Sequence, residues 1–270
     1  MQLSKIISFP FILIGLYYLY MAFEYAGGDY AYSLIGYVLV LAVLYILSPQ
    51  IDWWWYNKRP PRLPNAIRHL LDTNVHFYQN LSPEKQTLFR NRMGLYRHAV
   101  EFMPQAMEEV PLDIQYAAAA SVVTLTLNQE DFLLNKFEHI IAYPHPFPSP
   151  QHPEDWHTSE HFEEDGAILF SIEHLMKGFL ESRKYFHTGL YEYARIYQTT
   201  YPDKNYPVLG KDIWPKIEAV SGFKREGIEK WIGLPEVDLY AICTVLYFVF
   251  PKKMAQLMPN VHTQLTSIFC

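Results

Sequence analysis

The chain begins with two long apolar runs that contain no charged side chain. The first covers residues 6–23, the second covers residues 30–49, and the segment "EYAGGDY" between them has two glycines and two acidic residues. Each run is about as long as a helix that crosses a bilayer. The alternative for the first run is a cleaved signal peptide, but no small-residue cleavage site ends it and a second run follows at once. The pattern predicts a two-helix transmembrane hairpin.

Basic and aromatic residues follow the second run. The positive side chains are Lys58, Arg59, Arg62 and Arg68, whereas the segment between the runs has no base. Since positive residues stay on the cytoplasmic side, we expect both ends of the hairpin in the cytoplasm and a multi-pass protein of the inner membrane. The cluster at residues 53–56 is typical of an aromatic interface belt. These features predict a hairpin over residues 1–52, a stiff Pro-rich linker over residues 53–64 and a cytoplasmic domain over residues 65–270.

Composition limits the function of this domain. Half of the 270 residues are hydrophobic and 16% are aromatic, which is enough for a large core. The net charge of −6 and the lack of a basic stripe argue against nucleic-acid binding. The two cysteines, Cys243 and Cys270, lie in an apolar run and at the last residue, so we expect no reliance on disulfides, as in a reducing compartment.

The domain is predicted to be α+β and mainly helical. Ser82 and Pro83 have the residue types of an N-cap and a first helical position. Charge-poor residues 111–127 predict a buried helix, and residues 137–143 and 167–172 predict two short strands. Further helices are expected at 185–198, 237–250 and 251–269.

A histidine-rich segment is one candidate for chemistry. His157 to His161, "HTSEH", matches a pattern in which two histidines and a glutamate bind and use zinc on one face of a helix. The prolines before it and the turn residues after it favour irregular chain and a solvated polar loop. His157 and His161 therefore remain the alternative metal ligands.

A second candidate lies in "LYEYAR". Glu192 has Tyr191 directly before it and Arg195 three residues after it, so Tyr191 and Arg195 lie one turn apart on a helix. Zinc peptidases place two imidazoles at this spacing around a water-activating glutamate. Arg195 cannot be deprotonated in a protein and therefore cannot bind zinc. An ordinary core helix with Glu192 and Arg195 exposed is the other interpretation.

From about Leu63 onward, the chain resembles the zinc peptidases typified by Mlc titration factor A. The similar segments are "LSPEKQTLFRNRMGLY", "YAAAASVVTL", "FEHIIAYPHPF" and "EDGAILFSIEHLMKG". "LYEYAR" stands where that family has Leu-His-Glu-Phe-Ala-His. "DLYAICTVLYFVFPKKM" stands where it has the helix with a third ligand, a glutamate. The resemblance implies a zincin-like, metallopeptidase-like fold.

By this resemblance, the zinc ligands would be Tyr191, Arg195 and Val245, and only Glu192, in the general-base position, keeps its residue type. We therefore expect a degraded site without zinc, in which Arg195 pairs with Glu192, and a pseudoenzyme with a regulatory or protein-binding role at the membrane. The resemblance also implies a protein partner. The alternative is an active zinc peptidase with a relocated metal site. Histidines converging on Glu192 from elsewhere in the fold would argue against the degraded-site interpretation.

Overall fold

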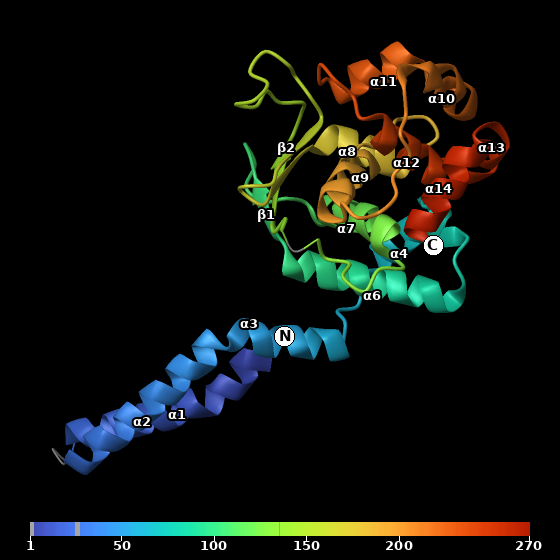
Figure 1. Ribbon diagram of the computed structural model, residues 1–270. Helices are drawn as coiled ribbons and strands as arrows, with labels where there is room; N and C mark the ends of the chain where they lie inside the picture. The colour runs from blue at the N-terminus through green and yellow to red at the C-terminus, as the bar shows by residue number, and fades with distance from the viewer. Residues whose placement is uncertain (1–2, 25–27, 135) are drawn as a thin grey trace. The chain divides into compact units, whose positions relative to one another are not determined.

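The computed structural model describes residues 3–24, 28–134 and 136–270 (Figure 1). The chain divides into two compact units, Met1–Pro61 and Arg62–Cys270. The structure is mostly helical, at 63%, with one small mixed sheet in the second unit.

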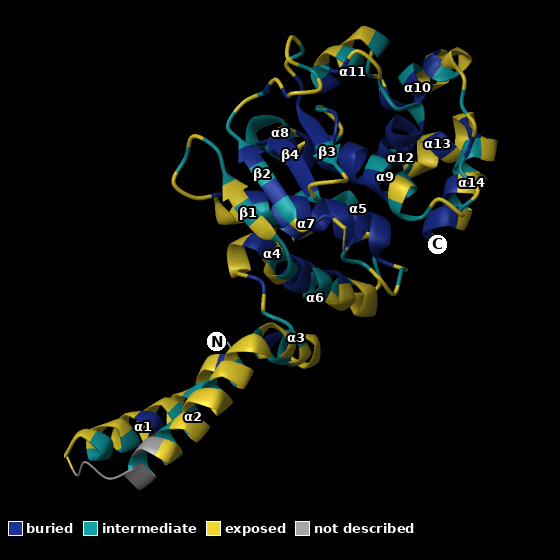
Figure 2. Ribbon diagram, turned by 60° about the vertical axis from the view of Figure 1, so that its left-hand side comes forward, coloured by how far each residue is buried: buried dark blue, intermediate teal, exposed yellow. Residues whose placement is uncertain are grey.

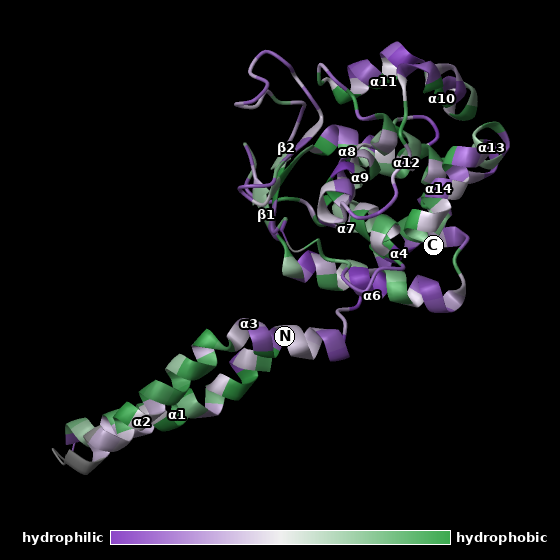
Figure 3. Cartoon of the chain, in the orientation of Figure 1, coloured by the Kyte–Doolittle hydropathy of each residue, from purple (hydrophilic) through white to green (hydrophobic). Residues whose placement is uncertain are grey.

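The first unit consists of α1 (Leu3–Glu24), α2 (Gly28–Ile46) and α3 (Ser48–Lys58). α1 and α2 lie side by side, and both are apolar along most of their length (Figure 3). By length and composition, α1 can cross a membrane, and the segment Tyr32–Ile46 of α2 passes this test together with α3, across a bend of 54°. The predicted turn between the runs includes residues 25–27, which lie outside the described residues, and the first half of the predicted linker is helical.

A buried carboxylate joins α1 to α3. Asp52 accepts hydrogen bonds from the backbone nitrogen of Ser4 at 2.9 Å and from its hydroxyl at 2.7 Å. The first four backbone N–H groups of a helix lack partners within the helix, so Asp52 satisfies one of these groups at the start of α1. The start of α1 and the segment after α2 are therefore held together.

The second unit contains a four-stranded sheet of order β1-β2-β4-β3. Its strands are β1 (Glu101–Pro104), β2 (His139–Tyr143), β3 (Ser159–Phe162) and β4 (Ala167–Ser171). β1, β2 and β4 are parallel, and β3 runs antiparallel along β4. The two predicted strands correspond to β2 and β4, whereas β1 and β3 were not predicted. The expectation of irregular, solvated chain at "HTSEH" is wrong, because residues 159–161 belong to β3 and residues 157–160 are buried.

Helices joined by loops form the rest of the second unit, and the inner faces of the helices are buried (Figure 2). Ser82 caps α6 by accepting from the backbone nitrogen of Lys85, as its residue type predicts. The closing helix expected over 251–269 is two helices, because Pro259 lacks the N–H needed inside a helix and starts a new one. The helices are α4 (Asn65–Asn74), α5 (His76–Gln79), α6 (Pro83–Ala99), α7 (Leu112–Thr126), α8 (Ile172–Leu180), α9 (Thr188–Thr200), α10 (Trp214–Ser221), α11 (Arg225–Ile232), α12 (Leu239–Val249), α13 (Pro251–Leu257) and α14 (Pro259–Phe269), with a short 3-10 helix at Lys211–Ile213.

α9 is central to this unit. It packs against α7, α8, α12 and β3. Gly189 permits the close approach of α9 to α7, since a Cβ at this position would lie 2.4 Å from the hydroxyl of Ser121. α9 begins at Thr188 rather than at 185, because the side chain of His187 accepts from the backbone nitrogen of Leu190 and caps the helix. The helices predicted at 185–198 and 237–250 correspond to α9 and α12, which pack against each other.

Candidate functional site

Glu192 lies in the middle of α9 and is fully buried. Three side chains surround its carboxylate. The hydroxyl of Ser159 donates to Oε2 at 2.6 Å, and Nδ1 of His161 lies 2.6 Å from Oε1. Nη1 of Arg195 donates to Oε1 at 3.1 Å and to Oε2 at 3.3 Å. The interpretation with Glu192 exposed on an ordinary core helix is therefore wrong, and the expected pairing with Arg195 is present.

β3 supplies two of these partners. Alternate residues of a strand point to the same face, so Ser159 and His161 both face α9. Their register is fixed by antiparallel pairing with Phe170 and Ile168 of β4. Ser159 was not predicted as a site residue, because no local sequence signal connects a serine in a polar segment to a glutamate 33 residues later.

The charges around Glu192 keep its carboxylate ionised. Burial alone would raise the pKa of Glu192, but the positive charge of Arg195 and the hydrogen bonds from His161 and Ser159 outweigh it and lower the pKa to about 2. The pKa of Arg195 is raised by Glu192 in return. With 26% of its side chain exposed, Arg195 lies between the buried carboxylate and solvent.

Tyr191, at the first expected ligand position, makes a structural contact. Its hydroxyl accepts a hydrogen bond from the backbone nitrogen of Asp238 at 3.0 Å. Asp238 caps α12 by accepting from the backbone nitrogen of Ala241 at 3.0 Å. The ring of Tyr191 also lies 5.8 Å from the guanidinium of Arg195. Tyr191 therefore ties α9 to the start of the helix that contains Val245, which is itself buried.

His157 contacts a different carboxylate. Its Nε2 lies 3.1 Å from Oε2 of Glu160, and its Nδ1 donates to the backbone oxygen of Asp155 at 2.9 Å. Burial lowers the pKa of His157, but the contact with Glu160 outweighs burial and raises it overall. The structure thus does not bring His157 and His161 to one point. Among the described residues, no group of three or more His, Cys, Asp or Glu side chains is arranged to hold a metal ion.

The residues at the three expected ligand positions do not fit zinc. Arg195 is a permanent cation that already pairs with Glu192, and Val245 has no donor atom. The hydroxyl of Tyr191 is engaged with Asp238, and burial raises its pKa, which disfavours the phenolate that would bind a metal. Nothing in this donor set replaces the nitrogen and carboxylate ligands that zinc prefers.

Comparison with protein families assigns the chain to a family. Residues 51–193 match the model of the glucose-regulated metallo-peptidase M90 family. The chain belongs to this family. The resemblance to the peptidases typified by Mlc titration factor A is confirmed, and the family is normally zinc-dependent. The match ends at Tyr193, so it includes Glu192 but neither Arg195 nor Val245. A search of curated proteins gives no match.

Proposed function

We propose that this member of the M90 family is a membrane-anchored, non-catalytic protein that binds a protein partner at the cytoplasmic face of the inner membrane. The observation that carries the proposal is the ion pair between Arg195 and Glu192. A glutamate that accepts from Arg195, Ser159 and His161 has a strongly lowered pKa and serves poorly as a general base near neutral pH, where catalysis needs a pKa close to the working pH. The carboxylate then has a structural role inside a fold inherited from peptidases.

Membrane anchoring rests on the first unit. α1 is long and apolar enough to span, and its exposed side chains include Phe9, Leu13 and Leu16. We take α2 as a second span, with the bend before α3 at the interface. Because Asp52 caps the start of α1, the two ends of such a hairpin meet on one side, as the positive-inside rule also requires.

After Cys270, a reporter that works in the cytoplasm is expected to be active, and a reporter that works in the periplasm is expected to be inactive. The reason is the basic cluster Lys58, Arg59 and Arg62, which follows the second apolar run. An alkaline phosphatase fusion reports a periplasmic location, and a green fluorescent protein fusion reports a cytoplasmic location. A control fusion after residue 29, between the two runs, is expected to give the opposite result. Phosphatase activity of the Cys270 fusion would overturn this orientation.

Purified protein is expected to contain far less than one zinc per chain and to lack peptidase activity. The reason is that guanidinium and isopropyl groups stand where imidazole and carboxylate would bind. Elemental analysis after dialysis against zinc measures the first quantity. Cleavage of a casein-derived peptide mixture, compared with Glu192→Gln, measures the second. Peptidase activity that Glu192→Gln abolishes would refute the non-catalytic assignment.

One contact favours a second function, an active zinc peptidase with a relocated site. His161 comes from a different element and touches Glu192 at 2.6 Å. This is one histidine rather than a convergent set, since His157 contacts Glu160 instead. One tightly bound zinc that is lost in both His161→Ala and His157→Ala would favour this function over the first. Phe162→Leu, directly after His161 on β3, is the control for damage to the strand.

A further inference from the structure

Two adjoining cavities lie behind α9, away from Glu192. The smaller has a volume of about 30 Å³ and the larger about 180 Å³. They share His76, Phe77, Phe248 and Val249. Leu190 of α9 lines the smaller cavity, and with 3.6 residues per turn Leu190 and Glu192 point roughly 200° apart. These cavities are therefore separate from the candidate site.

The side chains that line the two cavities differ in charge from the protein as a whole. None of the described residues that line the two cavities is acidic, although the protein has a net charge of −6. The larger cavity instead has Arg183, His76 and His262. Within the described part of the chain, Arg183 has no ion pair or hydrogen bond, and the nearby Glu181 pairs with Lys184 at 3.0 Å. An unpartnered guanidinium in an acid-free cavity favours an anionic ligand.

The walls of the larger cavity are aromatic. Phe77 and Phe248 meet edge to face with ring centres 5.3 Å apart, and Tyr247 lies 5.3 Å from the ring of His262. Such rings give a flat apolar body a large contact area at low entropic cost. The ligand therefore needs an apolar, ring-sized body as well as its charge.

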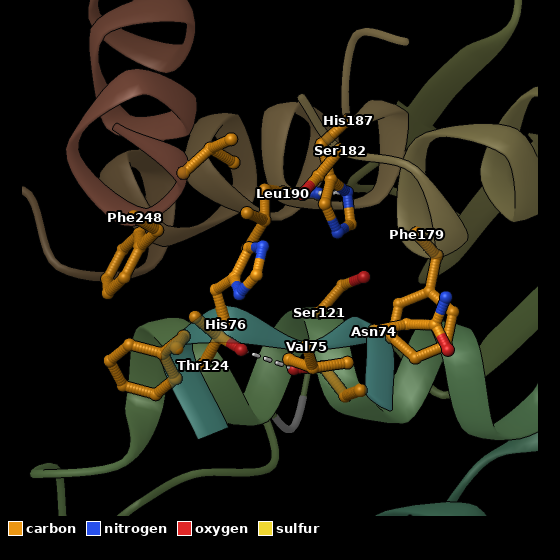
Figure 4. A pocket seen from close by; sticks show the side chains of 13 residues that line it. Asn74, Val75, His76, Ser121, Thr124, Phe179, Ser182, His187, Leu190 and Phe248 are labelled. Atoms are coloured by element: carbon orange, nitrogen blue, oxygen red, sulfur yellow. Dashed lines mark hydrogen bonds between the residues drawn. The ribbon is translucent and has the colours of Figure 1, made fainter. Parts of the chain in front are cut away.

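The smaller cavity adds an uncharged donor. Figure 4 shows the rings of His76 and His187 projecting into the space between α9 and α7. Nδ1 of His187 accepts from the backbone nitrogen of Leu190, and burial lowers the pKa of His187 to about 4. The imidazole is therefore neutral near pH 7, with its proton on Nε2. His187 therefore adds a neutral donor, and the exposed Arg183 supplies the permanent positive charge that binds the anion.

We propose that these cavities form a binding site for a small organic anion, a carboxylate on an aromatic or similarly compact apolar body. The carboxylate binds Arg183 through its free N–H donors, and the body lies against Phe77, Tyr247 and Phe248. Arg183 presents a planar fork that matches the two oxygens of a carboxylate. Charge decides the class of ligand, because the apolar walls accept amines, alcohols and carboxylates alike.

Three probes of equal size test this site: 3-phenylpropionate, 3-phenylpropan-1-ol and 3-phenylpropylamine. Titration calorimetry uses the full chain in bilayer discs, with protein-free discs as the blank. We expect the carboxylate to bind at least about tenfold more tightly than the alcohol, the factor for one charge-assisted hydrogen bond, and the amine not to bind. Arg183→Gln is expected to remove this preference. Lys252→Gln, which removes another exposed base beside the lining residue Pro251 and frees no carboxylate from a pair, is expected to keep it.

Each other result would overturn the site. Equal binding of the three probes would mean that the walls act without the charge. Retained preference in Arg183→Gln would place the anion elsewhere, and loss of the preference in Lys252→Gln would indicate a diffuse charge effect. Absence of carboxylate binding at millimolar concentration would exclude the site directly. Arg183 is exposed, so Arg183→Gln is expected to fold, and circular dichroism of each variant checks this.

Discussion

Arg195→Met is expected to destabilise the unit of residues 62–270 by about 3–5 kcal/mol, because it leaves the buried carboxylate of Glu192 without its cation. The remaining partners, Ser159 and His161, donate hydrogen bonds but do not replace a permanent charge so close to the carboxylate. Urea denaturation of the purified unit measures the free energy of unfolding. The midpoint shifts without a change in slope if the native fold is otherwise kept.

Arg225→Met is the matched control. Arg225 makes an ion pair with Glu229 at 2.8 Å, but both side chains are more than a third exposed. An exposed pair of this kind contributes less than about 1 kcal/mol, since water solvates both charges when the pair is broken. The double variant Glu192→Gln/Arg195→Met is expected to regain part of the stability lost in Arg195→Met. Equal losses at Arg195 and Arg225 would contradict a buried ion pair.

The pH dependence of stability gives a second measure of the same pair. The pKa of Glu192 is about 2 in the folded chain, below the ordinary value of 4.5. A lowered folded-state pKa contributes stability that is fully present above the unfolded-state pKa and is lost as pH falls through the window from about 4.5 to about 2. Glu192→Gln is expected to flatten the stability curve in this window. If Glu192→Gln loses stability between pH 4.5 and about pH 2 as the unsubstituted protein does, other carboxylates cause this loss.

Local signals in the sequence predicted the long helices but missed half of the sheet and six helices, which are α3, α4, α5, α8, α10 and α11. Ser82 followed by Pro83 marks the start of α6, and the run of small apolar residues in α7 indicates a buried helix. β2 and β4 are apolar enough to be recognised. β3 is not, because Ser159, Glu160 and His161 are polar residues that alternate between two buried ion clusters instead of between core and solvent.

Local sequence patterns also predict only part of the candidate site. The Glu192–Arg195 pair spans three residues, so helical geometry alone predicts it. The contacts from Ser159 and His161 depend on pairing between β3 and β4, which no local pattern encodes. Likewise, the contact between Tyr191 and Asp238 joins residues 47 positions apart. Family resemblance supplied the approximate place of α12, but not the hydrogen bond that fixes it.

Gly233→Ala is expected to destabilise the same unit by about 2–5 kcal/mol through two effects at one position. Gly233 ends α11 with φ of 82°, where a side chain is strained. A Cβ there would also lie 2.2 Å from the backbone oxygen of Trp156 and 2.8 Å from Cα of His157. Backbone atoms cannot move aside as a flexible side chain can, so the segment that leads into β3 must shift.

Gly222→Ala separates the two effects. Gly222 ends α10 in the same conformation, with φ of 80°, but nothing lies within 4 Å of its Cβ position. This variant therefore reports the conformational strain alone, about 1–2 kcal/mol. Because Thr158 donates to the backbone oxygen of Ile232 at 3.0 Å, the displacement in Gly233→Ala is transmitted to β3 and changes the contact of His161 with Glu192. The imidazole proton resonance of His161 is expected to move in Gly233→Ala and to stay in place in Gly222→Ala. Equal losses of stability and an unmoved resonance would mean that the backbone at residues 156–158 does not depend on this glycine.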